Sequence, residues 1–337
     1  MKLHEFHYDL PEALIAQYPL TNRANARLLV VKRDTGEIKH RYFYEIIEYF
    51  SPGDVLVLNN TKVYKARFIG KKETGGRVDI LVLSFQNNEG TALISPSGRI
   101  REKIRILLDE KYYAEVIERR GGRFSLKFSA SVKEVIEKLG KMPLPPYIKR
   151  VPEALDESEY QTIYAEKPGS VAAPTAGLHF TEEILNALKE RGVMIAYITL
   201  HIGPGTFKPI TSEDVEQHNM EPEYVEVSEE SAKIINTGKK IIGVGTSVAR
   251  ALEFVARTKF GGRHRLSAFA GYADLFIYPG FQFQIIDVMV TNFHLPCSTP
   301  LLLVCAFCNR DVIFKAYKEA IEKGYRFLSY GDAMLIL

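Results

Sequence analysis

The hydrophobic pattern of the chain changes near residue 60 and again near residue 150, and this change constrains the fold more than any other feature. Between these points lie five short β-rich runs, YKARFIGK, GRVDILVLS, GTALISP, YYAEVIER and GRFSLKFS, with glycine-containing turns such as Gly121-Gly122 among them. Short strands at this spacing predict a small antiparallel barrel. A helical pattern, SVKEVIEKLG, follows, and the proline-rich MPLPPYIKRVP is typical of an extended linker.

Strand and helix patterns alternate on both sides of this segment. Before it, ARLLVVKR and DVLVLNN predict strands, and LPEALIAQ, with Pro11 near its start, predicts a helix. After it, TEEILNALKERG, SEESAKIINTG, SVARALEFVART and VIFKAYKEAIEKG predict helices, and VMIAYITLHIG and KIIGVG predict strands. We therefore predict a discontinuous α/β domain, a mixed sheet or barrel covered by helices, formed by residues 1–60 and 151–337. Residues 61–150 form the inserted antiparallel β-barrel domain.

Lysine and arginine are concentrated in the inserted segment. Residues 61–150 carry 20 Lys and Arg against 10 Asp and Glu, although the net charge of the whole chain is only +3. This excess favours a polyanionic partner such as nucleic acid, but the solvated face of a small barrel explains it equally well. The segment RIREKIRILL supplies the candidates for phosphate contacts: Arg99, Arg101, Lys103 and Arg105.

Nothing in the sequence predicts export, a membrane span or a bound metal. The N-terminal residues lack the pattern of a signal peptide, and the longest apolar run, around Leu301–Phe307, is far shorter than the ~20 residues that cross a bilayer. Cys297, Cys305 and Cys308 are an odd number and lie too close together for a usual zinc module. We therefore predict a cytoplasmic protein in which the cysteines of LLLVCAFC pack in the core.

Two glycine-rich segments follow predicted strands, where α/β folds bind ligands. In KIIGVGTSVARALE, a strand leads through Gly245 to Thr246 and Ser247 at a helix start. This arrangement fits an anion site, and it fits a simple helix cap as well. LHIGPGTF places His201 before Gly203-Pro204-Gly205, which is either a ligand-binding turn or a plain one.

Two further segments combine histidine with other polar groups. TNFHLP places Asn292 and His294 after a strand pattern, and HNMEPE combines His218 with carboxylates that include Glu223. Imidazole beside carboxylate suits general acid–base chemistry. A structural histidine and a solvated acidic loop are the alternatives for these two segments.

The segment PGSVAAPTAGLHFT has small residues around Pro174 and ends in His179 and Thr181. Thr181, followed by two glutamates, predicts a capped helix start. A packing loop can also be this small, but it rarely brings an imidazole and a helix start to one point. We predict that this loop is the centre of the active site.

At these residues the sequence resembles the S-adenosylmethionine:tRNA ribosyltransferase-isomerases of bacterial queuosine synthesis. The motifs that carry the resemblance are GDVLVLNNTKV, MPLPPYI, YQTIYA, GSVAAPTAGLHFT, HIGPGTF, PGFQF and TNFHLPCSTPLLLV, and they run in order along essentially the whole chain. The resemblance implies transfer and isomerisation of the ribosyl part of S-adenosylmethionine onto 7-aminomethyl-7-deazaguanine at the wobble position of tRNA. Adenine and methionine leave, and the product is epoxyqueuosine-tRNA.

The resemblance also implies roles for individual residues. Candidate acid–base groups are His179, His201, His218, Glu223 and His294. Candidates for binding the small substrates are Asn59, Asn60, Thr175, Gly177, Gly203, Gly205, Thr206, Gly245, Thr246, Ser247, Arg250 and Asn292. The arginines and lysine of RIREKIRILL are expected to hold the anticodon arm. S-adenosylmethionine is a consumed co-substrate, and we expect no prosthetic group and a monomer.

Two positions depart from the family pattern. Glu221 stands where the family usually has a second histidine, and GTSVAR, at residues 245–250, has one hydroxyl fewer than the family's usual segment. Two other functions therefore compete with the ribosyltransferase-isomerase. One is a tRNA-binding protein whose site has decayed, and the other is a different S-adenosylmethionine-consuming tRNA transferase, such as an aminocarboxypropyl transferase.

Overall fold

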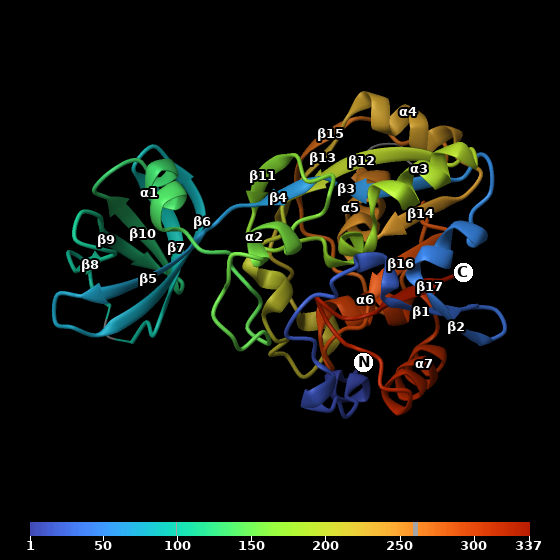
Figure 1. Cartoon of the computed structure of the whole chain (residues 1–337), viewed down its shortest axis with the longest axis horizontal. Helices are drawn as coiled ribbons and strands as arrows, with labels where there is room; N and C mark the ends of the chain where they lie inside the picture. Colours follow the sequence, from blue (N-terminus) through green and yellow to red (C-terminus); the bar gives the residue numbers. More distant parts are fainter. Residues whose placement is uncertain (99, 259–261) are drawn as a thin grey trace.

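The computed structural model describes residues 1–98, 100–258 and 262–337. Its larger part is built on a nine-stranded mixed sheet (Figure 1). In spatial order the strands are β15 (Phe269–Ala273), β13 (Glu223–Val227), β12 (Met194–Leu200), β3 (Val55–Asn59), β14 (Ile241–Val244), β16 (Val288–Asn292), β17 (Ala333–Ile336), β1 (Arg27–Val31) and β2 (Ile38–Tyr42). The prediction of a mixed sheet covered by helices is confirmed.

Alternating side chains of the central strands fill two separate cores, one on each face of the sheet. Val55 and Val57 of β3 belong to one core, and Leu56 and Leu58 belong to the other, as the two-residue period of a strand requires. The first face packs against α4 (Glu229–Thr237), α5 (Thr246–Thr258), α6 (Thr299–Phe307) and α7 (Arg310–Glu322). The second packs against α3 (Glu182–Glu190) and the 3₁₀ segment Phe43–Tyr49.

The four central strands position the functional residues. β12, β3, β14 and β16 are mutually parallel, so their carboxyl ends meet at one edge of the sheet. At this edge the chain continues into His201, Asn59, Gly245 and Asn292 respectively, all of them predicted site residues. Ligands of open α/β sheets bind at this edge, since the loops that follow the strands converge there.

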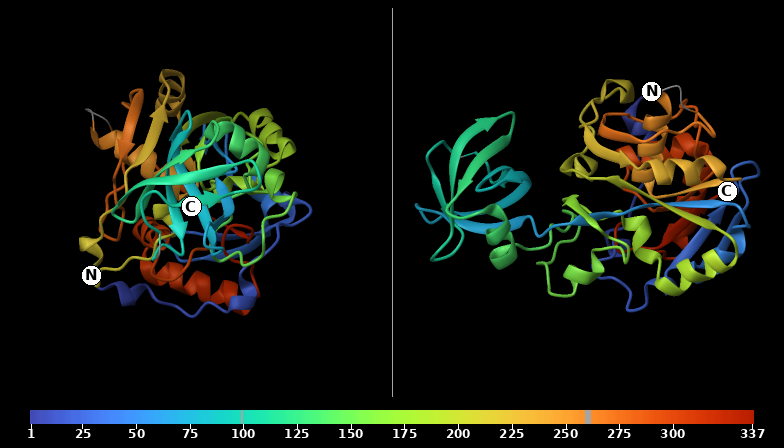
Figure 2. Two further views of the ribbon diagram at one scale, coloured as in Figure 1. Left: turned by 90° about the vertical axis from the view of Figure 1, so that its left-hand side faces the viewer. Right: turned by 90° about the horizontal axis from the view of Figure 1, so that it is seen from above.

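A closed six-stranded antiparallel barrel stands to one side of this body (Figures 1 and 2). Its strands, in chain order, are β5 (Arg67–Lys72), β6 (Arg77–Gln86), β7 (Glu89–Ser95), β8 (Arg105–Leu107), β9 (Tyr113–Arg120) and β10 (Arg123–Phe128). Helix α1 (Val132–Leu139) buries Val132, Val135 and Ile136 against the barrel core and ends before Gly140. The predicted antiparallel barrel is confirmed.

The chain enters and leaves the barrel at one place. Arg67 and Lys141 exchange backbone hydrogen bonds of 3.1 and 2.8 Å, and β4 (Thr61–Val63) pairs with β11 (Lys167–Ser170) beside the large sheet. We propose that residues 61–150 form an inserted domain, with the folded barrel at its centre and both of its ends resting on the main body. Met142, Leu144 and Ile148 of the returning segment pack there.

The helix predicted from LPEALIAQ is wrong. The structure has only a 3₁₀ turn, Glu12–Leu14, after which Ile15 forms a bridge with Phe327. The backbone N–H of Ala16 donates to the Phe327 carbonyl, so this segment pairs as extended chain instead of continuing as a helix. Cys305 and Cys308 are buried in the core, as predicted. Throughout the described ranges, no helix has the length and apolar character needed to cross a membrane.

Helix α2 (Asp156–Glu159) is short and follows the proline-rich segment. Its Asp156 is fully buried, and its carboxylate accepts three hydrogen bonds. They come from Arg150 Nη1 at 2.7 Å, Arg150 Nη2 at 2.6 Å and the Tyr330 hydroxyl at 2.8 Å. Burial alone would raise the pKa of Asp156, but the bonds from Arg150 and the Glu153 backbone outweigh it and lower that pKa. The hydrogen bond from Tyr330 joins the segment that returns from the barrel to the C-terminal part of the chain, and the ion pair with Arg150 holds Asp156 in place.

Candidate functional site

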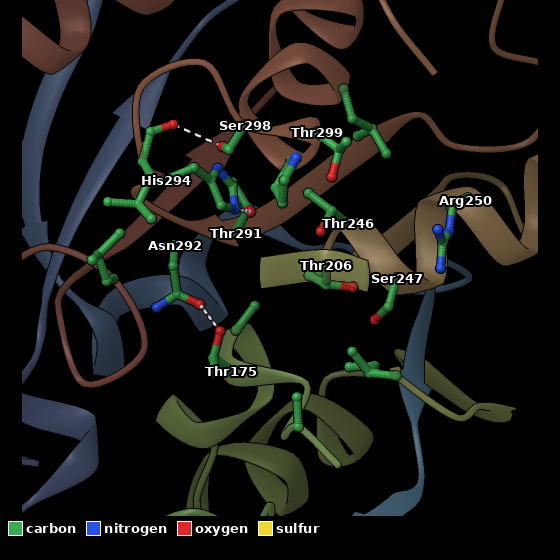
Figure 3. A pocket seen from close by; sticks show the side chains of 18 of the residues that line it. Thr175, Thr206, Thr246, Ser247, Arg250, Thr291, Asn292, His294, Ser298 and Thr299 are labelled. Carbon is green, nitrogen blue, oxygen red and sulfur yellow. Dashed lines mark hydrogen bonds between the residues drawn. The ribbon is translucent and has the colours of Figure 1, made fainter. Parts of the chain in front are cut away.

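A cavity of about 250 Å³ lies at the carboxyl edge of the central strands. Four segments far apart in the sequence form its walls (Figure 3). They are residues 172–176, Thr206 and residues 208–210 with Met220 and Glu223, residues 245–247 with Arg250 at the start of α5, and residues 291–300 before and at the start of α6. Leu275, Phe276 and Leu303 add an apolar side, so the cavity has both polar and apolar walls.

Two helices begin at the cavity wall. Thr246 opens the 13-residue α5, and Thr299 opens α6, whose N-cap Ser298 accepts a 3.4 Å hydrogen bond from the Leu301 amide. The free N–H groups of a helix start attract negative charge and oxygen acceptors. Gly245 has a φ of +94°, which favours glycine and lets β14 turn directly into α5.

A buried ion pair forms one end of the cavity. Arg250 of α5 pairs through Nη2 with Oε2 of Glu223, at the start of β13, and the two residues are 6% and 5% exposed. Glu223 Oε1 accepts the Gly203 amide at 2.7 Å and the Thr206 hydroxyl at 3.4 Å. Within the described part of the chain, no group accepts a hydrogen bond from the buried Nη1 of Arg250. Because Arg250 lines the cavity, this nitrogen is suited to an anionic ligand group, and burial lowers the arginine pKa to about 10.

A hydrogen-bonded relay forms the other end. The Thr175 hydroxyl donates to Asn292 Oδ1 at 2.9 Å, and Asn292 Nδ2 lies 3.2 Å from His179 Nε2 (Figure 3 shows the first bond). Asn292 Nδ2 also donates to the Asp332 carbonyl at 3.5 Å, and the His179 ring forms a hydrogen bond with the Arg23 backbone. His179 Nε2 is therefore an acceptor, and it fixes the Asn292 amide with its oxygen on the Thr175 side. His179 thus lies behind Asn292, while Asn292 and Thr175 face the cavity.

His294 lines the cavity next to Asn292. Its Nε2 is 3.3 Å from the Thr291 hydroxyl, and its Nδ1 is 3.4 Å from the Tyr317 hydroxyl. Tyr317 accepts the His294 backbone N–H at 3.0 Å, so its own proton is available for Nδ1. This network favours the tautomer with the proton on Nε2. Burial lowers the pKa of His294 to about 3, and the imidazole is therefore a neutral hydrogen-bond donor near pH 7.

Comparison with known proteins agrees with this architecture. The family described as queuosine biosynthesis protein matches residues 3–336. The chain belongs to this family. It is 48% identical to a Staphylococcus epidermidis protein and 49% identical to a Halothermothrix orenii protein, over the full length of each pair, and both relatives are named S-adenosylmethionine:tRNA ribosyltransferase-isomerase. The crystal structure of the S-adenosylmethionine tRNA ribosyltransferase from Thermotoga maritima is 35% identical, with a TM-score of 0.56 over 99% of this chain and 100% of that one.

In this member of the queuosine biosynthesis family, nine of the predicted site residues meet at the cavity. They are Thr175, Thr206, Glu223, Gly245, Thr246, Ser247, Arg250, Asn292 and His294. Among the five predicted acid–base groups, only Glu223 and His294 reach the wall. His218 packs edge-on against Phe276, with ring centroids 5.0 Å apart, and so lies behind a cavity-lining side chain.

Other predicted residues hold the edge of the sheet together. Asn59 donates to the Leu200 carbonyl and accepts the amides of Thr61 and Leu200. Asn60 pairs with Glu166 and Thr199, and His201 pairs with the Thr61 hydroxyl at 2.8 Å while stacking on Tyr224. The amide of Gly203 binds Glu223, and Gly205 lies beside the Glu221 side chain. These groups are engaged within the protein and position the loops that form the cavity.

Sequence reasoning did not single out several wall residues: Tyr147, Lys208, Met220, Phe276, Ser298 and Thr299. Ser298 followed by Thr299 and Pro300 is a recognisable helix start, and this signal could have been used. The others carry no local signal. In the barrel, Arg101, Lys103 and Arg105 are exposed, and Arg105 pairs with Glu115 at 3.3 Å and lies over the Tyr113 ring. Arg99 lies outside the described residues.

The buried His179 predicts a pH dependence of stability. Burial, followed by the charges of Arg23 and Arg326, lowers its pKa from 6.5 to about 3. Between pH 3 and pH 6.5, His179 therefore takes up a proton when the protein unfolds. Its neutral form contributes fully to the free energy of unfolding above pH 6.5, and this contribution is lost as the pH falls. The expected loss is about 1.4 kcal/mol per pH unit between pH 6 and pH 4. Denaturant titrations of wild type and His179→Gln should differ by this slope, and equal slopes would contradict the assignment.

Gly177 is predicted to be required for packing. A Cβ at this position would lie 2.0 Å from the buried hydroxyl of Tyr164 and 2.9 Å from Thr162 Cγ2. Gly177→Ala should therefore destabilise the protein by about 1–3 kcal/mol through overpacking. Tyr164→Phe, which removes the closest atom, should recover part of this loss in thermal unfolding. A variant as stable as wild type would show that the loop has room to move.

Proposed function

We propose that the protein is an S-adenosylmethionine:tRNA ribosyltransferase-isomerase. It transfers the ribosyl moiety of S-adenosylmethionine to 7-aminomethyl-7-deazaguanine in tRNA and isomerises it, giving epoxyqueuosine-tRNA, adenine and methionine. The observation that carries the proposal is the cavity at the sheet edge, with its polar and apolar walls, in a chain that aligns end to end with relatives of that name. S-adenosylmethionine is consumed in each turnover, and the proposal requires no prosthetic group.

The Arg250 end of the cavity is assigned to the methionine part of S-adenosylmethionine. Nη1 of Arg250 is buried without an acceptor among the described residues, and Thr246 and Ser247 stand beside it at the start of α5. A carboxylate placed there satisfies the guanidinium and interacts favourably with the helix start. Glu223 pairs with Arg250 and orients it, and the Thr206 hydroxyl donates to Glu223.

The Asn292 end is assigned to the purine-like base and the reacting centre. Asn292 Oδ1 accepts from Thr175 and retains a second lone pair toward the cavity, which suits an amino or ring N–H donor of a base. His294 donates a hydrogen bond through its Nε2–H to the departing adenine, while the ring stays neutral. An imidazole with a pKa of about 3 is a weak base, so the substrate amine itself is assigned the role of nucleophile and base. Positioning and hydrogen bonding then supply most of the catalysis.

The barrel is assigned to the anticodon arm. Arg101, Lys103 and Arg105 lie on its surface together with the larger excess of cations in residues 61–150. Phosphate contacts of this kind give affinity that decreases steeply with salt. The proposal includes a monomer working in the cytoplasm.

The decisive experiment incubates the protein with S-adenosylmethionine and tRNA that carries the aminomethyl-deazaguanine base. Adenine and methionine should appear in equal amounts, and the nucleoside should gain the mass of the rearranged ribosyl group. Binding of tRNA with no adenine release would identify a decayed enzyme. A nucleoside with an aminocarboxypropyl group would identify a different transferase. Unmodified tRNA is the matched control and should release no adenine.

A further inference from the structure

Glu221 joins a cation of the barrel to a cation at the cavity wall. Its Oε2 lies 3.0 Å from Nη2 of Arg123, at the start of β10, and its Oε1 contacts Nζ of Lys208. Arg123 and Glu221 are 98 residues apart in sequence, and Lys208 lines the cavity. The side chains of Arg123, Lys208 and Glu221 are 47%, 52% and 29% exposed. Solvent therefore reaches all three groups, and any of them is free to exchange its partner.

The stability of the fold does not explain this cluster. Exposed ion pairs contribute about 0–1 kcal/mol each, because solvent and salt screen them. Glu221 nevertheless remains ionised near neutral pH: burial alone would raise its pKa, but the bonds and charges of Lys208 and Arg123 outweigh it and lower the pKa. By contrast, Arg67, Arg105 and Arg120 pair with carboxylates of the barrel itself.

We propose that Arg123 and Lys208 form a binding site for one backbone phosphate of the RNA substrate, which Glu221 occupies in the free protein. Two cations that converge on the two oxygens of a carboxylate present the donor arrangement that a phosphodiester also requires. The RNA phosphate displaces the Glu221 carboxylate, which swings into solvent. Since Lys208 lines the cavity and Arg123 belongs to the barrel, this phosphate lies next to the nucleotide whose base enters the cavity. The inference rests on the proposed function.

Glu221 therefore sets the affinity for RNA without contacting it. In the free protein it neutralises two cations, and RNA must break both ion pairs before it binds there. Removing the carboxylate leaves both cations with mobile counterions, which RNA then releases. The affinity should rise, and the salt dependence should become steeper by about one unit in the slope of log K against log salt.

The test measures binding of a fluorescent anticodon stem–loop of unmodified RNA, without S-adenosylmethionine, over a range of salt concentrations. Glu221→Gln should bind about 5- to 10-fold more tightly than wild type at 0.1 M salt, with the steeper slope. Glu229→Gln is the matched control: it removes one negative charge from α4, where Glu229 pairs with the exposed Lys233 at 2.8 Å. This control should bind within about twofold of wild type.

The mechanism also predicts that the gain depends on the freed cations. In Arg123→Gln/Glu221→Gln/Lys208→Gln, the tightening should disappear and the slope should be no steeper than that of wild type. Equal affinities of Glu221→Gln and Glu229→Gln, or a gain that persists in the triple variant, would overturn the phosphate site. Failure of the wild type to bind RNA or to release adenine would instead overturn the proposed function. Circular dichroism verifies that each variant is folded.

Discussion

Replacing Arg250 with lysine is expected to raise the KM for S-adenosylmethionine about 50-fold while changing kcat by less than about threefold. The buried Nη1 of Arg250 is assigned to the methionine carboxylate, and a hydrogen bond to a charged group is worth about 1.5–3 kcal/mol. That carboxylate lies away from the bonds that break, so the contact contributes equally to the ground state and the transition state. Steady-state adenine release at varied S-adenosylmethionine concentration measures both constants.

Lysine is chosen because it keeps a positive charge opposite the buried Glu223. Arg250→Met would leave that carboxylate without its partner and cost about 3–5 kcal/mol of stability. Arg250→Met/Glu223→Gln removes both charges, so it should regain most of the stability while S-adenosylmethionine binding stays weak. If this double variant binds S-adenosylmethionine as well as wild type does, the ion pair is structural only.

Replacing Asn292 with alanine is expected to lower kcat/KM about 100-fold, because a buried hydrogen bond to the base is lost and the Thr175 hydroxyl loses its acceptor. In the proposed site, His179 contacts the cavity only through Asn292, so we assign it a positioning role. His179→Gln keeps an acceptor for Asn292 Nδ2 and should retain activity within about fivefold of wild type. His179→Leu removes the acceptor and should lose roughly as much as the Asn292 variant.

The pH profile separates positioning from proton transfer. The pKa of His179 is about 3, so this residue should not titrate between pH 5 and pH 8. The pH–rate profiles of wild type and His179→Gln should therefore have the same shape in that range. A limb of the wild-type profile in that range that vanishes in His179→Gln would mean that the imidazole itself transfers the proton. Equal activity of the glutamine and leucine variants would also contradict the relay.

The architecture was largely predictable because local patterns determine it. The two-residue period of GRVDILVLS and GRFSLKFS marks barrel strands, and the capped pattern SVKEVIEKLG marks α1. The prediction failed at LPEALIAQ, whose apolar spacing is helical. There the long-range bond from the Ala16 amide to the Phe327 carbonyl replaces the helix, and no local pattern encodes a partner 311 residues away.

The site was predictable as a set of segments but not as a set of roles. The carboxyl ends of parallel strands meet at one edge, which explains why Asn292 and Gly245 both line the cavity. Whether an imidazole faces the cavity depends on packing between distant segments. His179 lies behind Asn292, 113 residues away, and His201 turns toward Thr61, 140 residues away. The sequence likewise gives no sign that Glu221 pairs with Arg123 and Lys208.

The backbones of Arg67 and Lys141 are paired, so the chain enters and leaves the barrel at the same place. Strands paired in this way hold their Cα atoms about 5 Å apart, a gap that a two-residue hairpin closes. A two-residue hairpin in place of the barrel would therefore leave the chain path of the large sheet unchanged. Under the proposed function, changes on the outer surface of the barrel would alter the affinity for RNA and leave the residues of the sheet-edge cavity unchanged.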